Sequence, residues 1–174
     1  MRFSLKTGFA RILFLAQLIS AALLYPAPAQ ADWNGRITKI ADGDILTMVT
    51  DDNRTLTFRL FAVDCPEPGQ PYAQQARDLV KELVLDDPRL VTALEELRDQ
   101  VGQVLAVVVL ADGSTLNDRL LMEGLAWFDF RLCGENSFCK GMMDLEKQAR
   151  DQRRGLWADQ NPLPPWDFKA SQSQ

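Results

Sequence analysis

The segment Thr55-Leu56-Thr57-Phe58-Arg59-Leu60-Phe61 alternates polar residues with apolar ones and is rich in β-branched and aromatic side chains. A period of two is typical of a strand with one buried face. Asp51-Asp52-Asn53 before it favours a turn, and Ile45 to Thr50 alternates in the same way. Ala41-Asp42-Gly43-Asp44 is a further turn, which follows the alternating segment Arg36 to Ile40. The sequence therefore predicts three short antiparallel strands.

Beyond Pro66 and Gly69 the hydrophobic period changes from two to about 3.6 residues. Apolar side chains recur there every three or four residues, which predicts an amphipathic helix from about Tyr72 to Leu85. Ser114 or Thr115 can cap a second helix that runs to about Glu123. A third helix is predicted from about Met142 to Arg153.

Two further segments are predicted to be strands. Val104 to Leu110 is apolar and β-branched, which is typical of a buried strand. Leu90 to Arg98 has helix-favouring residues, but a turn through 99–103 would let it pair with the strand that follows. Five strands and three helices predict an α+β fold with a mainly β core, namely a five-stranded OB-type Greek-key barrel. Such barrels bind oligonucleotides or oligosaccharides, but the fold alone does not identify the ligand.

The composition fits one globular domain and excludes several kinds of chemistry. The chain has 174 residues, of which 47% are hydrophobic, enough to build a core. It has no histidine, which excludes Ser-His-Asp catalysis, Cys-His catalysis and histidine-ligated zinc. Acid–base or metal chemistry in this protein therefore has to use carboxylates.

The first 31 residues are predicted to be a secretory signal peptide. Three basic residues precede the apolar run Ile12 to Leu24, which is too short to span a bilayer. Ala29-Gln30-Ala31 supplies the small residues that signal peptidase accepts, so we expect cleavage before Asp32. A retained N-terminal anchor helix is the alternative. After cleavage we expect a periplasmic or secreted monomer with no stable membrane association.

The mature chain divides into a domain over residues 32–158 and a Pro-rich, partly disordered tail over residues 159–174. Asn161-Pro162-Leu163-Pro164-Pro165 in this tail disfavours regular structure. Without the signal peptide, 16 basic and 24 acidic residues leave a net charge of −8. That charge opposes strong non-specific binding to nucleic acid, although a local cleft can still be basic.

The three cysteines have different expected states. Cysteines of an exported protein meet oxidising conditions in which they can pair. Cys133 and Cys139 enclose a short loop that contains a glycine, and we predict a disulfide between them, with two free surface thiols as the alternative. Cys65 would stay unpaired, and the chain has no Cys-x-x-Cys motif that would make it a redox centre.

Acidic residues gather at two predicted strand ends. Asp42-Gly43-Asp44 joins the first two strands, and Asp64-Cys65-Pro66-Glu67 follows the third, which carries Arg59. In a closed barrel these loops can bring carboxylates to one hard cation such as Ca²⁺. Glu67 suits a general base or a group that orients water. The alternative for the two clusters is that they are ordinary acidic turns, and the alternative for Glu67 is a solvated acid in a loop.

The chain resembles the staphylococcal nuclease-like (thermonuclease) domain family over nearly all of its mature length. The family's fold is an OB barrel with three helices, and its activity is Ca²⁺-dependent hydrolysis of phosphodiester bonds in DNA and RNA. The resemblance rests on five motifs, which are Ile40-Ala41-Asp42-Gly43-Asp44, Phe58-Arg59-Leu60-Phe61-Ala62-Val63-Asp64-Cys65-Pro66-Glu67, Gly69-Gln70-Pro71-Tyr72, Glu123-Gly124-Leu125-Ala126-Trp127 and Arg153-Arg154-Gly155-Leu156-Trp157.

The resemblance implies a role for each residue at the matching positions. Asp44 and Asp64 would be the Ca²⁺ carboxylates, and Cys65 would offer its backbone carbonyl to the ion. Arg59 would neutralise the scissile phosphate, and Glu67 would activate or position the attacking water. The partner would be nucleic acid, as single-stranded DNA or RNA. None of these roles needs a histidine.

The chain departs from the family on the substrate side of this site. The family's second catalytic arginine lies in an Asp-x-Tyr-Gly-Arg pattern, where this chain has Asp99-Gln100-Val101-Gly102-Gln103. Gln103 can donate a hydrogen bond to the substrate but has no charge, and losing one charge stabiliser costs on the order of 3 kcal/mol in the transition state. Arg98 is a candidate substitute, with a solvated turn charge as the alternative. Phe130 could stack on a base of the substrate.

Two functions are consistent with these observations. The first is an exported Ca²⁺-dependent nuclease whose activity is reduced or altered by Gln103. The second is a non-catalytic periplasmic OB module that binds a ligand or a metal, which the net charge and the loss of the second arginine favour. We favour the enzyme, because a module released from catalysis has little physical reason to keep three acids and an arginine together, namely Asp44, Asp64, Glu67 and Arg59.

Overall fold

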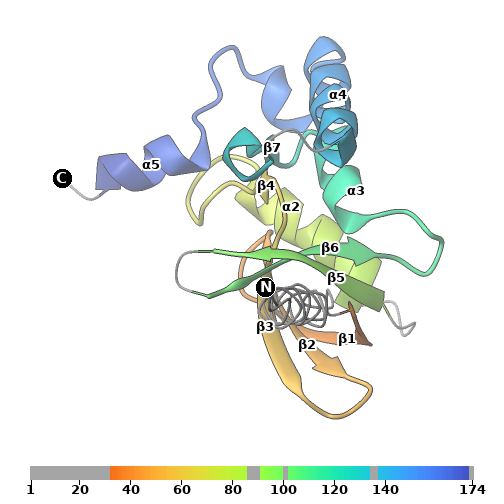
Figure 1. Cartoon of the computed structure of the whole chain (residues 1–174). Helices are drawn as coiled ribbons and strands as arrows, with labels where there is room; N and C mark the ends of the chain where they lie inside the picture. Colours follow the sequence, from red (N-terminus) through yellow and green to blue (C-terminus); the bar gives the residue numbers. More distant parts are fainter. Residues whose placement is uncertain (1–31, 86–90, 100–101, 134–136, 173–174) are drawn as a thin grey trace, which may run out of the picture.

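Five strands close into a barrel in the order β1-β2-β3-β6-β5 (Figure 1). The computed structural model describes residues 32–85, 91–99, 102–133 and 137–172, so the predicted signal peptide lies outside the described residues. The predicted five-stranded OB-type barrel is confirmed. Its strands are β1 (Asp32–Ile40), β2 (Ile45–Thr50), β3 (Thr55–Leu60), β5 (Val91–Arg98) and β6 (Val104–Val109).

Pairing on both sides explains why the ambiguous segment before the last barrel strand is itself a strand. β5 pairs antiparallel with the first residues of β1 and with β6 along its whole length. These two neighbours supply ladder hydrogen bonds that outweigh the helix propensity of its residues. The pairing with β5 also extends β1 back to Asp32, before the predicted start at Arg36. Parallel pairing of β3 with β6, in which Phe58 lies beside Val104, completes the barrel.

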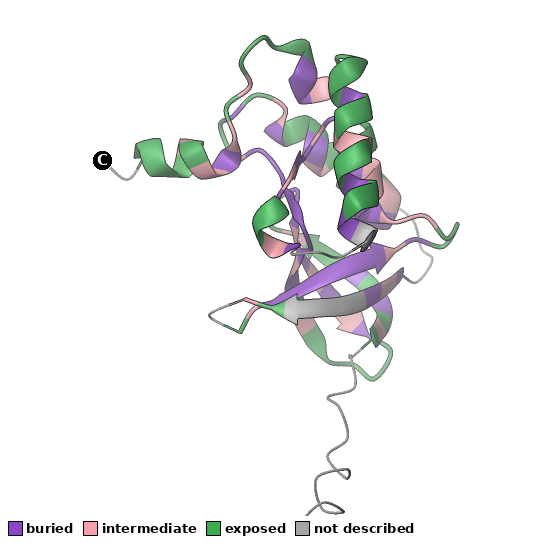
Figure 2. Cartoon of the chain, turned by 45° about the horizontal axis from the view of Figure 1, so that its top comes forward, coloured by how far each residue is buried: buried purple, intermediate pink, exposed green. Residues whose placement is uncertain are grey.

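Every second side chain of these strands points inward, as the period of two predicts, and these side chains fill the barrel. Leu46 and Met48 of β2 are fully buried, as are Phe58 and Leu60 of β3. Figure 2 shows buried residues, in purple, along the strands. Truncating a side chain such as Phe58 to Ala would cost about 3–5 kcal/mol. Because Arg59 lies between two inward-facing residues, its side chain points to the opposite face of the sheet. The core therefore fixes the direction in which this arginine points.

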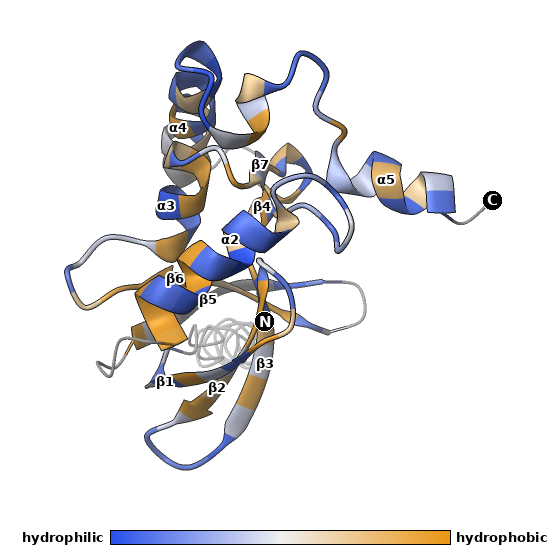
Figure 3. Ribbon diagram, turned by 180° about the vertical axis from the view of Figure 1, so that it is seen from behind, coloured by the Kyte–Doolittle hydropathy of each residue, from blue (hydrophilic) through white to orange (hydrophobic). Residues whose placement is uncertain are grey.

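The three predicted helices are present, with some different ends. α2 (Ala73–Val80) continues into a π-helical turn over Lys81–Leu85 and buries Ala73, Ala76 and Val80. Figure 3 shows that α2 also carries hydrophilic residues. α3 (Leu116–Met122) begins after Thr115, whose hydroxyl accepts a hydrogen bond from the backbone of Asp118 at 3.0 Å. α4 (Ser137–Asp151) begins before the predicted start at Met142.

Three elements were not expected from the sequence. β4 (Val63–Asp64) pairs with β7 (Trp127–Phe128) as a separate two-stranded sheet. Strands of two residues show no periodicity that a sequence pattern could reveal. α5 (Pro165–Gln172) forms where a tail without regular structure is predicted. It can form because the last proline of the Pro-rich segment occupies the first helical position, where a missing N–H is tolerated.

The predicted disulfide between Cys133 and Cys139 is present. The two sulfurs are 2.14 Å apart and the two Cα atoms 5.9 Å apart. The bond joins the end of a short 3₁₀ turn, Phe130–Leu132, to the beginning of α4. Cys65 is buried and unpaired, as predicted. In the part of the chain that the structure describes, no helix is long and apolar enough to cross a membrane.

Candidate active site

Asp44 and Asp64 are brought together by two loops that pack closely. A β-carbon on Gly43 would lie 2.7 Å from the β-carbon of Cys65, so only glycine fits between the two loops. The backbone N–H of Leu60 donates to the carbonyl of Asp44 at 2.8 Å. Asp64 is the last residue of β4, where it lies opposite Trp127 of β7. Backbone contacts therefore fix the positions of both carboxylates.

Arg59 lies between these two carboxylates. Its Nε atom is 2.7 Å from Oδ2 of Asp44, and its Nη2 atom is 2.7 Å from Oδ1 of Asp64. The first contact is a hydrogen bond. The second has the distance of an ion pair without the angles of a hydrogen bond, so Oδ1 of Asp64 is buried without a hydrogen-bonding partner among the described residues. Three of the predicted site residues thus converge on one point, as the family resemblance implies.

Burial dominates the electrostatics of this cluster. Desolvation raises the pKa of Asp44 to about 6, because Arg59 offsets only part of it and Asp64 adds repulsion. Desolvation also raises the pKa of Asp64, again against the opposing charge of Arg59. Burial alone would lower the pKa of Arg59, but the two carboxylates outweigh it and raise that pKa. For both acids, burial therefore penalises the charged form by more than Arg59 favours it.

Glu67 follows Asp64 by three residues and is held by partners that include a distant part of the chain. Its Oε1 atom is 2.6 Å from Nζ of Lys169 in α5. Its backbone N–H donates to Oε1 of Gln70 at 2.8 Å, and Nε2 of Gln70 donates to the carbonyl of Leu163 at 2.9 Å. Gln70 is buried, and both hydrogen bonds are partly buried. The loop that carries Glu67 is thus tied to the C-terminal segment.

Arg131 is a second arginine near the acids that sequence reasoning missed. Two of its nitrogens, Nε and Nη2, each donate to an oxygen of buried Asp129 at 2.7 Å. Its Nη2 atom is also 3.9 Å from Oδ2 of Asp64. The hydrogen bonds to Asp129 are the main reason that the pKa of Arg131 is raised. The signal available in the sequence was Asp-x-Arg, an acid and an arginine two residues apart, directly after the Trp127 motif.

The predicted substrate-side residues lie in three different settings. Gln103 precedes β6, and the pairing of Val104 with Phe58 puts it beside the strand that carries Arg59. Arg98, the candidate substitute for the missing arginine, is exposed and donates to the carbonyl of Gly102 in its own turn at 3.2 Å. Phe130 is 69% exposed and directly precedes Arg131. Contacts of Gln103 and Phe130 with a substrate stay a prediction.

The donor set fits a hard cation such as Ca²⁺. Asp44 and Asp64 are buried carboxylates that face one guanidinium, and an oxygen of Asp64 lacks a hydrogen bond. Oxygen ligands of this kind are those that Ca²⁺ takes. Among the described residues, no group of three or more acidic or cysteine side chains forms a metal cage. Burial raises the pKa of the Cys65 thiol well above its usual value, so only the backbone carbonyl of this residue suits the ion.

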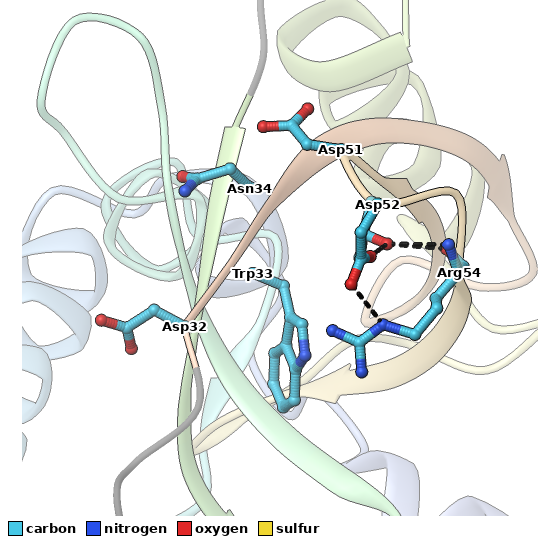
Figure 4. Close-up of a pocket in the computed structure, with 7 residues that line it drawn as sticks. Asp32, Trp33, Asn34, Asp51, Asp52 and Arg54 are labelled. Carbon is cyan, nitrogen blue, oxygen red and sulfur yellow. Dashed lines mark hydrogen bonds and ion pairs between the residues drawn. The ribbon is translucent and has the colours of Figure 1, made fainter.

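A polar pocket elsewhere on the barrel contains none of the predicted site residues. It is lined by Trp33 and Asn34 of β1 and by residues of the turn between β2 and β3 (Figure 4). Its ion pair, from Arg54 to Asp52 at 2.7 Å, is largely exposed and therefore contributes little to stability. Asp44 precedes β2 and this turn follows it, so the pocket and the acidic cluster lie at opposite ends of that strand. The buried cluster is the better candidate for chemistry.

Comparison with known proteins points to one family. The family model described as "Staphylococcal nuclease homologue" matches residues 57–159, a range that includes Arg59, Asp64 and Glu67. An "Uncharacterized endonuclease" from Escherichia coli is 34% identical over 139 residues, which cover 80% of this chain and 86% of the relative. A "Micrococcal nuclease" from Shigella flexneri is 32% identical over 173 residues, which cover 95% of each chain.

Proposed function

The chain belongs to the staphylococcal nuclease family, and we propose that it is a Ca²⁺-dependent nuclease that hydrolyses phosphodiester bonds in DNA and RNA. The observation that carries this proposal is the convergence of buried Asp44 and Asp64 on Arg59. Glu67 follows Asp64 by three residues and is held by Lys169. Desolvated acids with raised pKa values beside a specific charge partner are typical of functional sites, which supports this proposal.

Asp44 and Asp64, together with the backbone carbonyl of Cys65, would hold the calcium ion. Bound there, the ion supplies a Lewis acid next to a phosphoryl oxygen. Arg59 contributes a fixed positive charge, and its guanidinium has more N–H donors than the two carboxylates use. Those remaining donors can bind the equatorial oxygens of the phosphate. Charge that is positioned in advance in this way stabilises the transition state of hydrolysis.

Glu67 would act on the attacking water. The water oxygen forms a bond to phosphorus while Glu67 accepts the water's proton, and the bond from phosphorus to the leaving sugar oxygen breaks. The leaving oxygen takes a proton from solvent. The hydrogen bond from the Glu67 backbone to Gln70 and the ion pair with Lys169 hold the carboxylate in place for this role. A positioned general base contributes about 10²–10⁴-fold to the rate.

Export of the protein is part of the proposal. The Cys133–Cys139 disulfide supports it, because such bonds persist in oxidising compartments and are rare in the cytosol. The mature protein would then act in the periplasm or outside the cell, as a monomer.

One observation favours a second function, a non-catalytic OB module. Gln103 replaces the second catalytic arginine, so the site has lost a charge that the family uses. Such a module would keep the ion or a ligand at the acidic cluster without cleaving a phosphodiester.

Hydrolysis of denatured DNA and of RNA, with Ca²⁺ or with chelator, tests the choice between the two. The purified protein is compared with Glu67→Gln and with Glu82→Gln, a matched change at an exposed residue of the π-helical turn. If the protein is an enzyme, we expect cleavage in Ca²⁺, with a rate that falls about 10²–10⁴-fold in Glu67→Gln and is unchanged in Glu82→Gln. If the folded protein cleaves neither substrate, the nuclease hypothesis is wrong and the non-catalytic binding module is the function that agrees with the result.

A further inference from the structure

Helix α5 presents two neighbouring side chains to the acidic cluster. Trp166 and Lys169 are three residues apart, so they lie on the same face of the helix. The Trp166 ring is 5.7 Å from the ring of Trp127 in β7 and lies 4.8 Å from the guanidinium carbon of Arg131. Lys169 reaches Glu67. In Figures 1 and 3 the first turn of α5 lies beside β4 and β7.

This position of α5 is anchored by buried contacts. Pro165, the first residue of the helix, is buried, and the carbonyl of Leu163 before it accepts a hydrogen bond from buried Gln70. Gln70 also accepts the hydrogen bond from the backbone of Glu67, so one side chain connects the proposed base to the C-terminal segment. The helix therefore has a defined place next to the proposed active site.

Helix α5 brings a positive charge to Glu67, in a site that lacks the family's second arginine. Gln103 is neutral at the place of the family's second arginine. Lys169 lies 2.6 Å from Glu67, and its charge also acts on Asp64. The side chain of Lys169 is 53% exposed, so a ligand from solution can reach it. An ammonium has three N–H donors and can hold a carboxylate and a phosphate oxygen together.

We propose that Lys169 binds a phosphate of the nucleic-acid substrate beside Glu67 and supplies the positive charge that Gln103 lacks, with Arg131, held by Trp166, as the second cation of this subsite. This inference rests on the proposed nuclease function. Lys169 lies beyond residues 57–159, so the range that the family model matches does not include it. The C-terminal segment is then part of the active site and not a tail.

Binding and cleavage separate this inference from the proposed function. Binding of a fluorescent single-stranded oligonucleotide is measured by anisotropy in chelator, where the proposed reaction cannot proceed, over a range of salt concentrations. The proteins compared are wild type, Lys169→Gln, Lys169→Arg and Lys147→Gln, whose lysine pairs with Asp151 on the exposed side of α4. We expect Lys169→Gln to weaken binding about tenfold at low salt and to reduce the slope of log K against log salt by about 0.7, the loss of one phosphate contact.

Lys169→Arg keeps the charge and should bind almost as tightly as wild type, and Lys147→Gln should leave the slope unchanged. An unchanged slope in Lys169→Gln would overturn the proposal, even if the wild-type protein is an active nuclease. A reduced slope would support the subsite even if the wild-type protein cleaves no substrate. Because Lys169 is half exposed, the replacements should fold, and circular dichroism together with the melting temperature checks this for each variant.

Cleavage in Ca²⁺ provides the second test. We expect Lys169→Gln to lower kcat/KM about 10–100-fold and Gln103→Arg to raise kcat/KM more in the Lys169→Gln background than in wild type, because the two charges would serve the same phosphate group. Equal effects of Gln103→Arg in both backgrounds would contradict that shared role. Higher activity in Lys169→Gln would mean that the ion pair with Glu67 blocks the site, which would also overturn the proposal.

Discussion

Replacing Asp44 by Asn tests whether this buried carboxylate destabilises the protein when no metal is bound. Asn has nearly the shape of a protonated Asp, so the variant mimics the neutral form of Asp44. Burial, only partly offset by Arg59, raises the pKa of Asp44 from 3.8 to about 6. We therefore expect Asp44→Asn to be more stable than wild type at pH 7.5 in chelator, although it loses a proposed calcium ligand.

The magnitude and the sign both come from this pKa. One pKa unit corresponds to about 1.4 kcal/mol, so a rise from 3.8 to about 6 corresponds to about 3 kcal/mol. Folded protein holds the Asp44 proton more tightly than the unfolded chain does. The stability that Asp44 contributes is therefore fully present below pH 3.8 and is lost as the pH rises through about 6. The advantage of Asp44→Asn should be largest above pH 7 and fall below about 1 kcal/mol near pH 4.

Urea unfolding followed by tryptophan fluorescence measures this difference, because Trp127 and Trp157 are buried. With a urea slope of about 2 kcal/mol per molar, the midpoint should rise by up to about 1.5 M at pH 7.5. Asp51→Asn, at an exposed residue after β2, is the matched control and should not move the midpoint. An Asp44→Asn protein that is less stable than wild type both at pH 7.5 and near pH 4 would refute the reasoning, since the ion pair with Arg59 would then outweigh burial.

Three further predictions concern other parts of the site. Gly43→Ala would press its new β-carbon against Cys65, so urea unfolding should show about 1–3 kcal/mol less stability, and a midpoint equal to that of wild type would mean that the loops are not closely packed. Reduction of the Cys133–Cys139 bond should lower the free energy of unfolding by about 2 kcal/mol, which unfolding with and without reductant measures; equal midpoints would count against it. Gln103→Arg should raise kcat/KM of wild type, but by less than the roughly hundredfold that a charge stabiliser worth about 3 kcal/mol adds to a site without one, because Lys169 would already serve the phosphate; a value no higher than that of wild type would show that this position does not face the phosphate.

Local patterns explain why most of the barrel could be predicted from the sequence. The period of two in β2 and β3, the Asp-Gly turn before β2 and the Asp51-Asp52-Asn53 turn after it depend only on neighbouring residues. They place Asp44 directly before β2 and Arg59 on the adjacent strand β3. Asp64 could be added because its motif follows β3 directly. The convergence of these three side chains is a consequence of strand order and turn geometry.

The rest of the site depends on contacts between distant parts of the chain, and the local periodicity of a sequence does not predict such contacts. β4 and β7 are too short to show a pattern, and their pairing joins residues far apart in the sequence. The ion pair between Glu67 and Lys169 has the same character, because α5 reaches its place through contacts with Gln70 and Trp127. A Pro-rich segment with a polar end gave no sign that a helix would contact the proposed active site.

The dependence of cleavage on free Ca²⁺ tests the central claim most directly. The rate at which the purified protein hydrolyses denatured DNA is measured across Ca²⁺ concentrations for wild type, Asp64→Asn and Asp51→Asn. A site held by Asp44 and Asp64 predicts saturable activation that chelator abolishes, a much weaker response in Asp64→Asn and a wild-type response in Asp51→Asn. Cleavage that persists in chelator, or a calcium response that Asp64→Asn leaves unchanged, would contradict it.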